Sequence, residues 1–134
     1  MDRSKARACA VKLVYEWDMG GDGGEDTLIN LLEIQPDERE ADFMTSLFDG
    51  VRGHRDELDQ LIAEHLREGW SLERIARVDH AILLVAVYEL RYTDLKDSIV
   101  INEAIEVAKE YSTDKAASFI NGVLGSISRA KANV

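Results

Sequence analysis

The sequence has one cysteine, one proline and no long run of apolar residues. The lone cysteine, Cys9, excludes an internal disulfide, and its apolar neighbours predict a small buried side chain rather than a nucleophile. No stretch of about 18 apolar residues is present that could cross a membrane. The first ten residues also lack the apolar core of a signal peptide. We therefore expect a cytoplasmic protein that makes no contact with a membrane.

The sequence also lacks the short motifs that hold metals and phosphates. Its three histidines never form an H-x-x-x-H pair or stand near the cysteine, so local spacing builds no zinc site, and we expect them at the surface or its boundary. The stretch GGDGGED has no Lys-Ser or Lys-Thr after it and no strand before it, which excludes a P-loop or a dinucleotide fold. No metal and no cofactor are expected.

Apolar residues recur at spacings of three and four, and alternation with a period of two is scarce, so the sequence predicts an all-α protein. With 134 residues, of which 46% are hydrophobic, the chain fits a single helical domain over residues 1–134. The run from Asp79 to Tyr92 is apolar on nearly every side, which indicates a central helix. Helices are predicted over residues 4–18, 27–33, 37–51, 55–67, 79–92, 99–111 and 114–131, with a short turn after Ser71.

Charge is unevenly distributed along the chain. The net charge is −10, yet residues 1–12 carry +3 and residues 112–134 carry +2, which leaves −15 for the middle. If the two ends meet in space they form one basic patch, and the acidic surface is free for a basic protein partner. Alternatively, the segregation is accidental and only keeps the chain soluble. Charge alone leaves both interpretations open.

Four polar residues stand in otherwise apolar helical segments. Glu89 and Glu103 are expected to pair with a backbone amide or an arginine, with an acid or base role as the alternative. Asn102 and Asn121 occupy positions where leucine would serve packing better. We expect their amides to form hydrogen bonds that tie neighbouring helices or caps together.

Phe119 falls to one side of the apolar stripe of the last predicted helix. On that flank lie Lys115, Ser118 and Gly122, which give a cation, a short hydroxyl and no side chain. A ring that solvent can reach beside a positive charge suits stacking on an unpaired base. Spacing alone favours the other interpretation, a boundary phenylalanine that packs on another helix.

Four segments together resemble the NusB family of bacterial transcription antitermination factors. They cover nearly the whole chain and comprise RSKARACAVKLVYEW at 3–17, WSLERIARVDHAILLVAVYEL at 70–90, INEAIEVAKEY at 101–111 and FINGVL at 119–124. The resemblance implies two small helical bundles packed around a central apolar helix, with no catalytic activity and no cofactor. It also implies binding of boxA RNA together with NusE, a ribosomal small-subunit protein. That complex joins the assembly in which RNA polymerase reads through terminators of ribosomal RNA operons.

The resemblance also implies roles for individual residues. Asp79 is expected on the NusE-facing side. The residues expected on the RNA-binding side are Arg3, Lys5, Arg7, Tyr15, Lys115 and Phe119. Ser4 stands where the family commonly has an arginine, which means fewer phosphate contacts. We therefore expect weak RNA binding by the protein alone, with NusE supplying much of the positive surface.

Two other functions stay open. One is a helical interaction or dimerisation module that does not bind RNA. The other is the NusB-like module that precedes the catalytic domain of some ribosomal RNA cytosine methyltransferases. Such an enzyme needs a downstream α/β domain that binds its cofactor. This interpretation is therefore expected to hold only if the sequence is a fragment of a longer protein. Formation of a homodimer also stays open.

Overall fold

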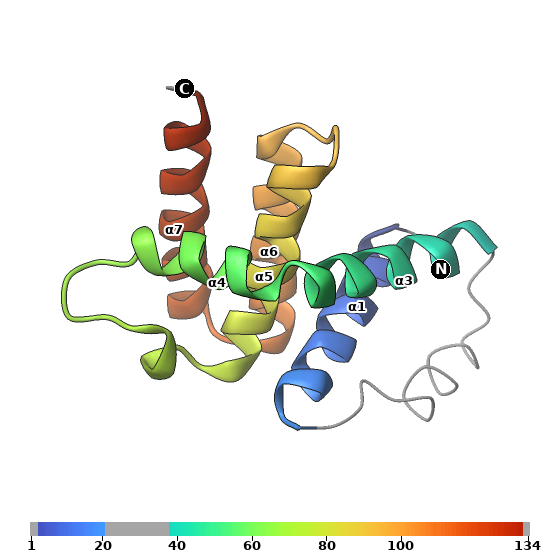
Figure 1. Cartoon of the computed structure of the whole chain (residues 1–134), viewed down its shortest axis with the longest axis horizontal. Coiled ribbons are helices and arrows are strands. Elements are labelled where there is room, and N and C mark those ends of the chain that lie inside the picture. Colours follow the sequence, from blue (N-terminus) through green and yellow to red (C-terminus); the bar gives the residue numbers. More distant parts are fainter. Residues whose placement is uncertain (1–2, 21–37, 133–134) are drawn as a thin grey trace.

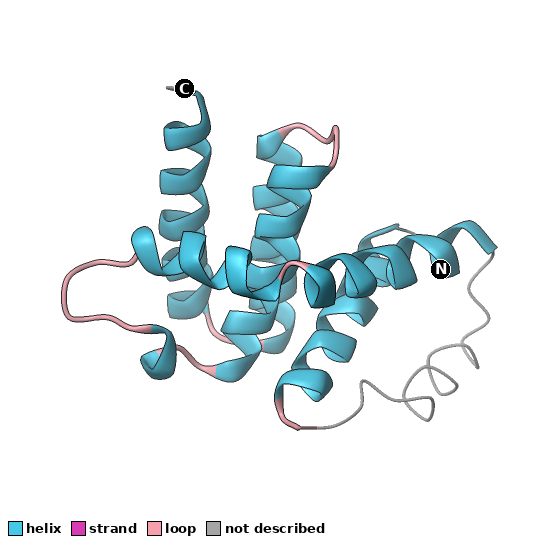
Figure 2. Ribbon diagram, in the orientation of Figure 1, coloured by secondary structure: helices cyan, strands magenta, loops and turns pink. Residues whose placement is uncertain are grey.

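The computed structural model describes residues 3–20 and 38–132, and these residues are helical apart from short connections (Figures 1 and 2). The elements are α1 (Arg3–Asp18), α3 (Glu38–Gly53), α4 (Arg55–Glu64), the short 3-10 helix η1 (Leu72–Arg74), α5 (Arg77–Tyr92), α6 (Asp97–Tyr111) and α7 (Asp114–Ala132). The all-α prediction is confirmed. The helix predicted over 27–33 and most of the GGDGGED stretch lie outside the described residues. Within the described ranges, no helix has both the length and the apolar character needed to cross a bilayer.

α5 is the centre of the fold. Every residue from Ala81 to Val87 is buried, and α1, α3, α4, α6 and α7 all contact this helix. A helix that is apolar on all sides must be covered on all sides, which is why the other helices gather around it. Around α5, α1 packs against α3 and α6 packs against α7. α6 also meets α1, where the Ser4 hydroxyl donates to Glu103 at 3.0 Å. The central helix predicted from the sequence is confirmed.

α3 and α4 follow one another across α5 with a break near Gly53 (Figure 1). The crossing depends on Gly50, because a Cβ at this position would overlap the ring of Tyr88 on α5. A residue without a side chain is therefore favoured where α3 packs against the Tyr88 ring. α4 ends at Glu64, three residues before the predicted end. The connection that follows contains Gly69, whose φ of +89° favours glycine.

An internal ion pair joins α1 to α5. Arg7 donates from Nε and Nη2 to the two carboxylate oxygens of Glu89, at 2.6 and 2.9 Å. Its Nη1 lies 3.5 Å from a carboxylate oxygen of Glu103 on α6. The expectation that Glu89 and Glu103 pair with an arginine is confirmed. Asn102 and Asn121 are both exposed, so the prediction that their amides tie helices together inside the bundle is wrong.

Two further sequence predictions concern Cys9 and the histidines. Cys9 is buried, as predicted, and burial raises the pKa of its thiol although Lys12 acts in the opposite direction. The prediction that every histidine lies at the surface or its boundary is wrong for His80, which is buried. Its Nε2 lies 2.6 Å from Asp59 on α4. Burial acts to raise the pKa of Asp59, but hydrogen bonds from His80 and Arg55 outweigh burial and lower it.

Candidate nucleic-acid interface

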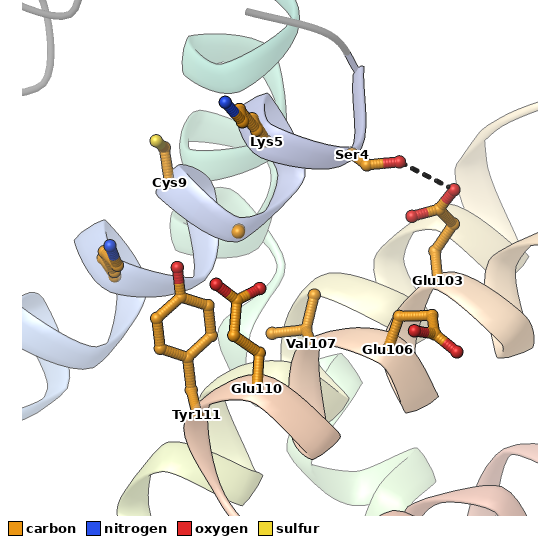
Figure 3. Close-up of a pocket in the computed structure, with 10 residues that line it drawn as sticks. Ser4, Lys5, Cys9, Glu103, Glu106, Val107, Glu110 and Tyr111 are labelled. Atoms are coloured by element: carbon orange, nitrogen blue, oxygen red, sulfur yellow. Dashed lines mark hydrogen bonds between the residues drawn. The ribbon is translucent and has the colours of Figure 1, made fainter.

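A groove of about 340 Å³ runs between α1 and α6 (Figure 3). Its floor includes Ala8, Cys9 and Val107, which are buried. Lys5 and Lys12 line it from α1. Three glutamates line it from α6, namely Glu103, Glu106 and Glu110. The groove therefore has an apolar floor between one basic and one acidic wall.

A second cavity, of about 360 Å³, adjoins the groove and shares Ala8, Lys12 and Tyr111 with it. Tyr15 on α1 and Tyr111 at the end of α6 both line this cavity. Their exposed fractions are 39% and 41%. The Nζ of Lys12 lies 4.8 Å from the centre of the Tyr111 ring, within the range of a cation–π contact. Two exposed aromatic rings and a lysine thus lie together, and proteins that bind single-stranded nucleic acid combine aromatic rings with positive charge in this way.

Asp79 has a structural position at the edge of this surface. It is only 7% exposed, and it accepts a 2.7 Å hydrogen bond from the hydroxyl of Ser112. Ser112 belongs to the link between α6 and α7, so the bond fixes the segment that carries Tyr111 before it and Lys115 after it. A carboxylate that is buried and occupied in this way offers little to a protein partner. The structure therefore gives Asp79 a positioning role at the α6–α7 link, and the NusE-facing role expected for it stays a prediction.

The basic residues of α1 divide between two flanks. Lys5 and Lys12 line the groove, whereas the guanidinium groups of Arg3 and Arg7 lie 4.4 and 5.2 Å from the ring centre of Phe43 on α3. Arg3 is exposed, but Arg7 is 5% exposed. Because Arg7 is buried and already bound to Glu89, the phosphate contact expected for it is wrong. Its charge holds α1 in the fold instead.

Lys115 and Phe119 lie four residues apart on α7 and therefore share one face of that helix. Lys115 is exposed. Phe119 is only partly buried, and it packs both against the core and against Trp70, with 5.5 Å between ring centres. The ring therefore packs on part of its surface, as the boundary interpretation expects, and meets solvent on the rest. Its stacking on an unpaired base stays a prediction.

The two basic ends of the chain do not form one patch. Figure 1 shows the first turn of α1 and the last turn of α7 well apart. Lys131 donates to Asp97 and to the backbone oxygen of Leu90, both at 2.8 Å. It lies about 24 Å along the helix from Lys115. The end of α7 therefore lies far from Tyr111 and the groove, and the interpretation in which the two basic ends form one patch is wrong.

Tyr111 is a residue of this surface that the sequence predictions missed. The signal was present in helical spacing, because Glu103, Val107 and Tyr111 recur every four residues and so share one face of α6. On α1, Lys12 and Tyr15 lie three residues apart and so share one face of that helix in the same way. What the spacing could not give is that these two faces oppose each other, because this depends on how α1 and α6 pack on α5.

Helices gathered around one apolar helix, with a groove on the outside that has a basic and an acidic wall, define an all-α protein with a NusB-like fold. The NusB family model matches residues 4–129. The chain belongs to the NusB family.

Similar proteins agree with this assignment. The transcription antitermination protein NusB of a Nitratiruptor species is 40% identical over 98% of this chain and 94% of its own length. That of Symbiobacterium thermophilum is 40% identical over 96% of this chain and 90% of its own. A structure of T. maritima NusB has a TM-score of 0.86 and 31% identity, covering 96% of this chain and 92% of that one. A crystal structure of antitermination factors NusB and NusE in complex with dsRNA has a TM-score of 0.83 and 29% identity, covering 97% and 99%.

Proposed function

We propose that this protein is a non-catalytic transcription antitermination factor. It binds boxA RNA of ribosomal RNA operons together with NusE, and the complex acts within the assembly that lets RNA polymerase read through terminators. The observation that supports RNA binding most strongly is the α1–α6 groove with its adjoining cavity, where Tyr15, Lys12 and Tyr111 lie together at the surface. The names of the similar proteins support the antitermination role and the partner.

In this proposal, the aromatic side chains of the surface contact bases and the lysines contact phosphates. Unpaired bases stack on Tyr15 and Tyr111, since every base has a face that an aromatic ring can take. Lys5, Lys12 and Lys115 contact phosphates, which fixes the position of the strand without reading its sequence. Phe119 extends this surface along the beginning of α7, and Arg3 adds a positive charge on the other flank of α1, beside Phe43. Arg7 and Asp79 shape it from beneath and make no contact with RNA.

The acidic wall limits how tightly the protein alone holds RNA. Glu106 and Glu110 are exposed and line the groove opposite Lys5 and Lys12. Figure 3 shows the side chains of Glu110 and Tyr111 directed from α6 toward α1. Phosphates entering the groove meet negative as well as positive charge, and the protein as a whole carries −10. Positive charge supplied by NusE then accounts for tight binding by the pair.

Fluorescence anisotropy with labelled boxA RNA, recorded with and without NusE, tests the proposal. We expect weak binding by the protein alone and a cooperative gain with NusE. Tyr111→Ala should lower the affinity by about 5- to 150-fold, the effect of one stacked base. Lys12→Gln should lower it and reduce the salt slope by about 1. Lys96→Gln is the matched control, because Lys96 is exposed but lies outside the cavities that form the groove.

The surplus of negative charge favours one other function, a helical interaction module for basic proteins that does not bind RNA. In that case NusE binds but the anisotropy of the RNA does not change with or without it. The Tyr111→Ala and Lys12→Gln variants then behave as the unmodified protein does. This result would contradict the proposed function.

A further inference from the structure

Trp70 is an exposed aromatic side chain to which neither the family comparison nor the groove assigns a role. It lies in the connection between α4 and η1, and its exposed fraction is 49%. A single exposed apolar residue needs no explanation by itself. Trp70, however, lies against Phe119 of α7, with 5.5 Å between the ring centres and 36° between the ring planes. The indole therefore lies beside the Phe119 ring, and part of the indole is exposed to solvent.

The backbone on both sides of Trp70 is held in place. The Trp70 amide donates to the carbonyl of Arg67 at 3.0 Å, and Nη1 of Arg74 donates to the carbonyl of Gly69 at 2.9 Å. At the start of the connection, a ring nitrogen of His65 lies 2.8 Å from the hydroxyl of Ser126 on α7. The first two bonds hold the connection internally, and the third fastens its start to α7. The indole thus has a defined position, and its outer face is exposed to solvent.

The surroundings of the two rings suit a nucleotide. Lys115 lies one helical turn before Phe119 and is exposed, so it can reach a phosphate. One turn after Phe119, the site of a Cβ on Gly122 has no atom within 4 Å. A planar ligand therefore has open space beside the rings. Arg67 and Arg74 are also exposed close to Trp70 in the sequence.

We infer that Trp70, supported from beneath by Phe119, is a stacking platform for an unpaired base of the bound RNA. This inference rests on the proposed function and extends its surface from the groove across the beginning of α7 to the α4–η1 connection. The indole offers the larger and more exposed of the two ring faces. Phe119 holds the indole in place, and Lys115 contacts the adjoining phosphate.

The Trp17→Phe variant gives a direct test, because the chain has only two tryptophans and the variant leaves Trp70 as the sole indole. Trp17 packs against Phe48, so a melting curve first checks that this variant is folded. The variant is titrated with single-stranded boxA RNA and, separately, with NusE, while indole emission is recorded. Labelled RNA reports binding in parallel by anisotropy. We expect RNA to quench the emission of Trp70 over the same concentration range in which anisotropy rises.

Substitutions at Trp70 complete the test. Trp70→Ala should weaken RNA binding by about 5- to 150-fold, and Trp70→Phe should restore most of the affinity because it keeps a ring. Ile99→Ala is the matched control, since it removes an exposed apolar side chain at the start of α6 and should leave affinity unchanged. A melting temperature for each variant separates loss of a contact from loss of the fold.

Three results would overturn the inference in distinguishable ways. If RNA binds but the emission of Trp70 and the affinity of Trp70→Ala both stay unchanged, the platform is wrong and the proposed function stands. If NusE alone changes the emission and Trp70→Ala weakens only NusE binding, Trp70 contacts a protein instead. If RNA binds to no variant, with or without NusE, the proposed function itself fails.

Discussion

Arg7 offers the sharpest test of how α1 is held, because its charge is buried and paired. In the Arg7→Met variant, the Glu89 carboxylate loses both of its charged hydrogen bonds, of 2.6 and 2.9 Å. The Glu89 side chain is 0% exposed, so water cannot replace them. Removing one partner of a buried ion pair costs about 3–5 kcal/mol. Since a domain of this size is stable by only about 5–15 kcal/mol, the variant should lose a large share of its free energy of unfolding.

Urea unfolding at pH 7 measures this loss, and a double-mutant cycle identifies its cause. In Arg7→Met/Glu89→Leu, no unpaired charge is left at the pair, so most of the lost stability should return. Lys5→Met is the matched control, because it removes the same charge two residues away on the exposed side of α1. It should cost less than about 1 kcal/mol but weaken RNA binding. If the free energy of unfolding of Arg7→Met lies within about 1 kcal/mol of that of the unmodified protein at an unchanged m-value, the buried ion pair is refuted.

Three further predictions concern packing, the acidic wall and pH. Gly50→Ala should destabilise the protein by about 1–3 kcal/mol in urea unfolding, because the added methyl group overlaps Tyr88; unchanged stability would contradict the close crossing of α3 and α5. Glu106→Gln/Glu110→Gln should raise RNA affinity by about 3- to 10-fold at low salt, less as salt screens the groove. An anisotropy titration measures this change. If the double variant binds RNA more weakly than the unmodified protein, Glu106 and Glu110 do not repel the RNA. Because the pKa of Asp59 is lowered in the folded state, its contribution to stability is present above the usual carboxyl pKa and is lost as pH falls through the lowered value. In Asp59→Asn, the free energy of unfolding should therefore fall less steeply with pH below about pH 4. If it falls as steeply as in the unmodified protein, the ionised form of Asp59 does not stabilise the fold.

Helical periodicity was sufficient to predict the all-α fold and the central position of α5, because a segment that is apolar on all sides has to be buried. It also predicted that Glu89 pairs inside the fold, since a carboxylate in an apolar helix needs a partner. It could not identify that partner as Arg7. Arg7 lies 82 positions earlier in the sequence, and only the packing of α1 on α5 brings the two charges together.

The candidate site was harder to predict for the same reason. Lys5, Tyr15 and Lys115 were expected on the RNA side and are exposed in the structure. Their contacts with RNA stay predictions. Tyr111 was missed, because its importance depends on its position opposite Tyr15 across two helices. Composition likewise could not show that Trp70, from a connection between helices, would lie on Phe119.

The central claim is that RNA occupies the α1–α6 groove and the beginning of α7. Amide chemical shifts of the isotope-labelled protein, followed by NMR while boxA RNA is added in the presence of unlabelled NusE, test it most directly when compared with a titration by NusE alone. The RNA-dependent changes should concentrate at Lys12, Tyr15, Tyr111 and Lys115. Changes confined to α3, α4 or the end of α7 would place the RNA elsewhere and contradict the claim.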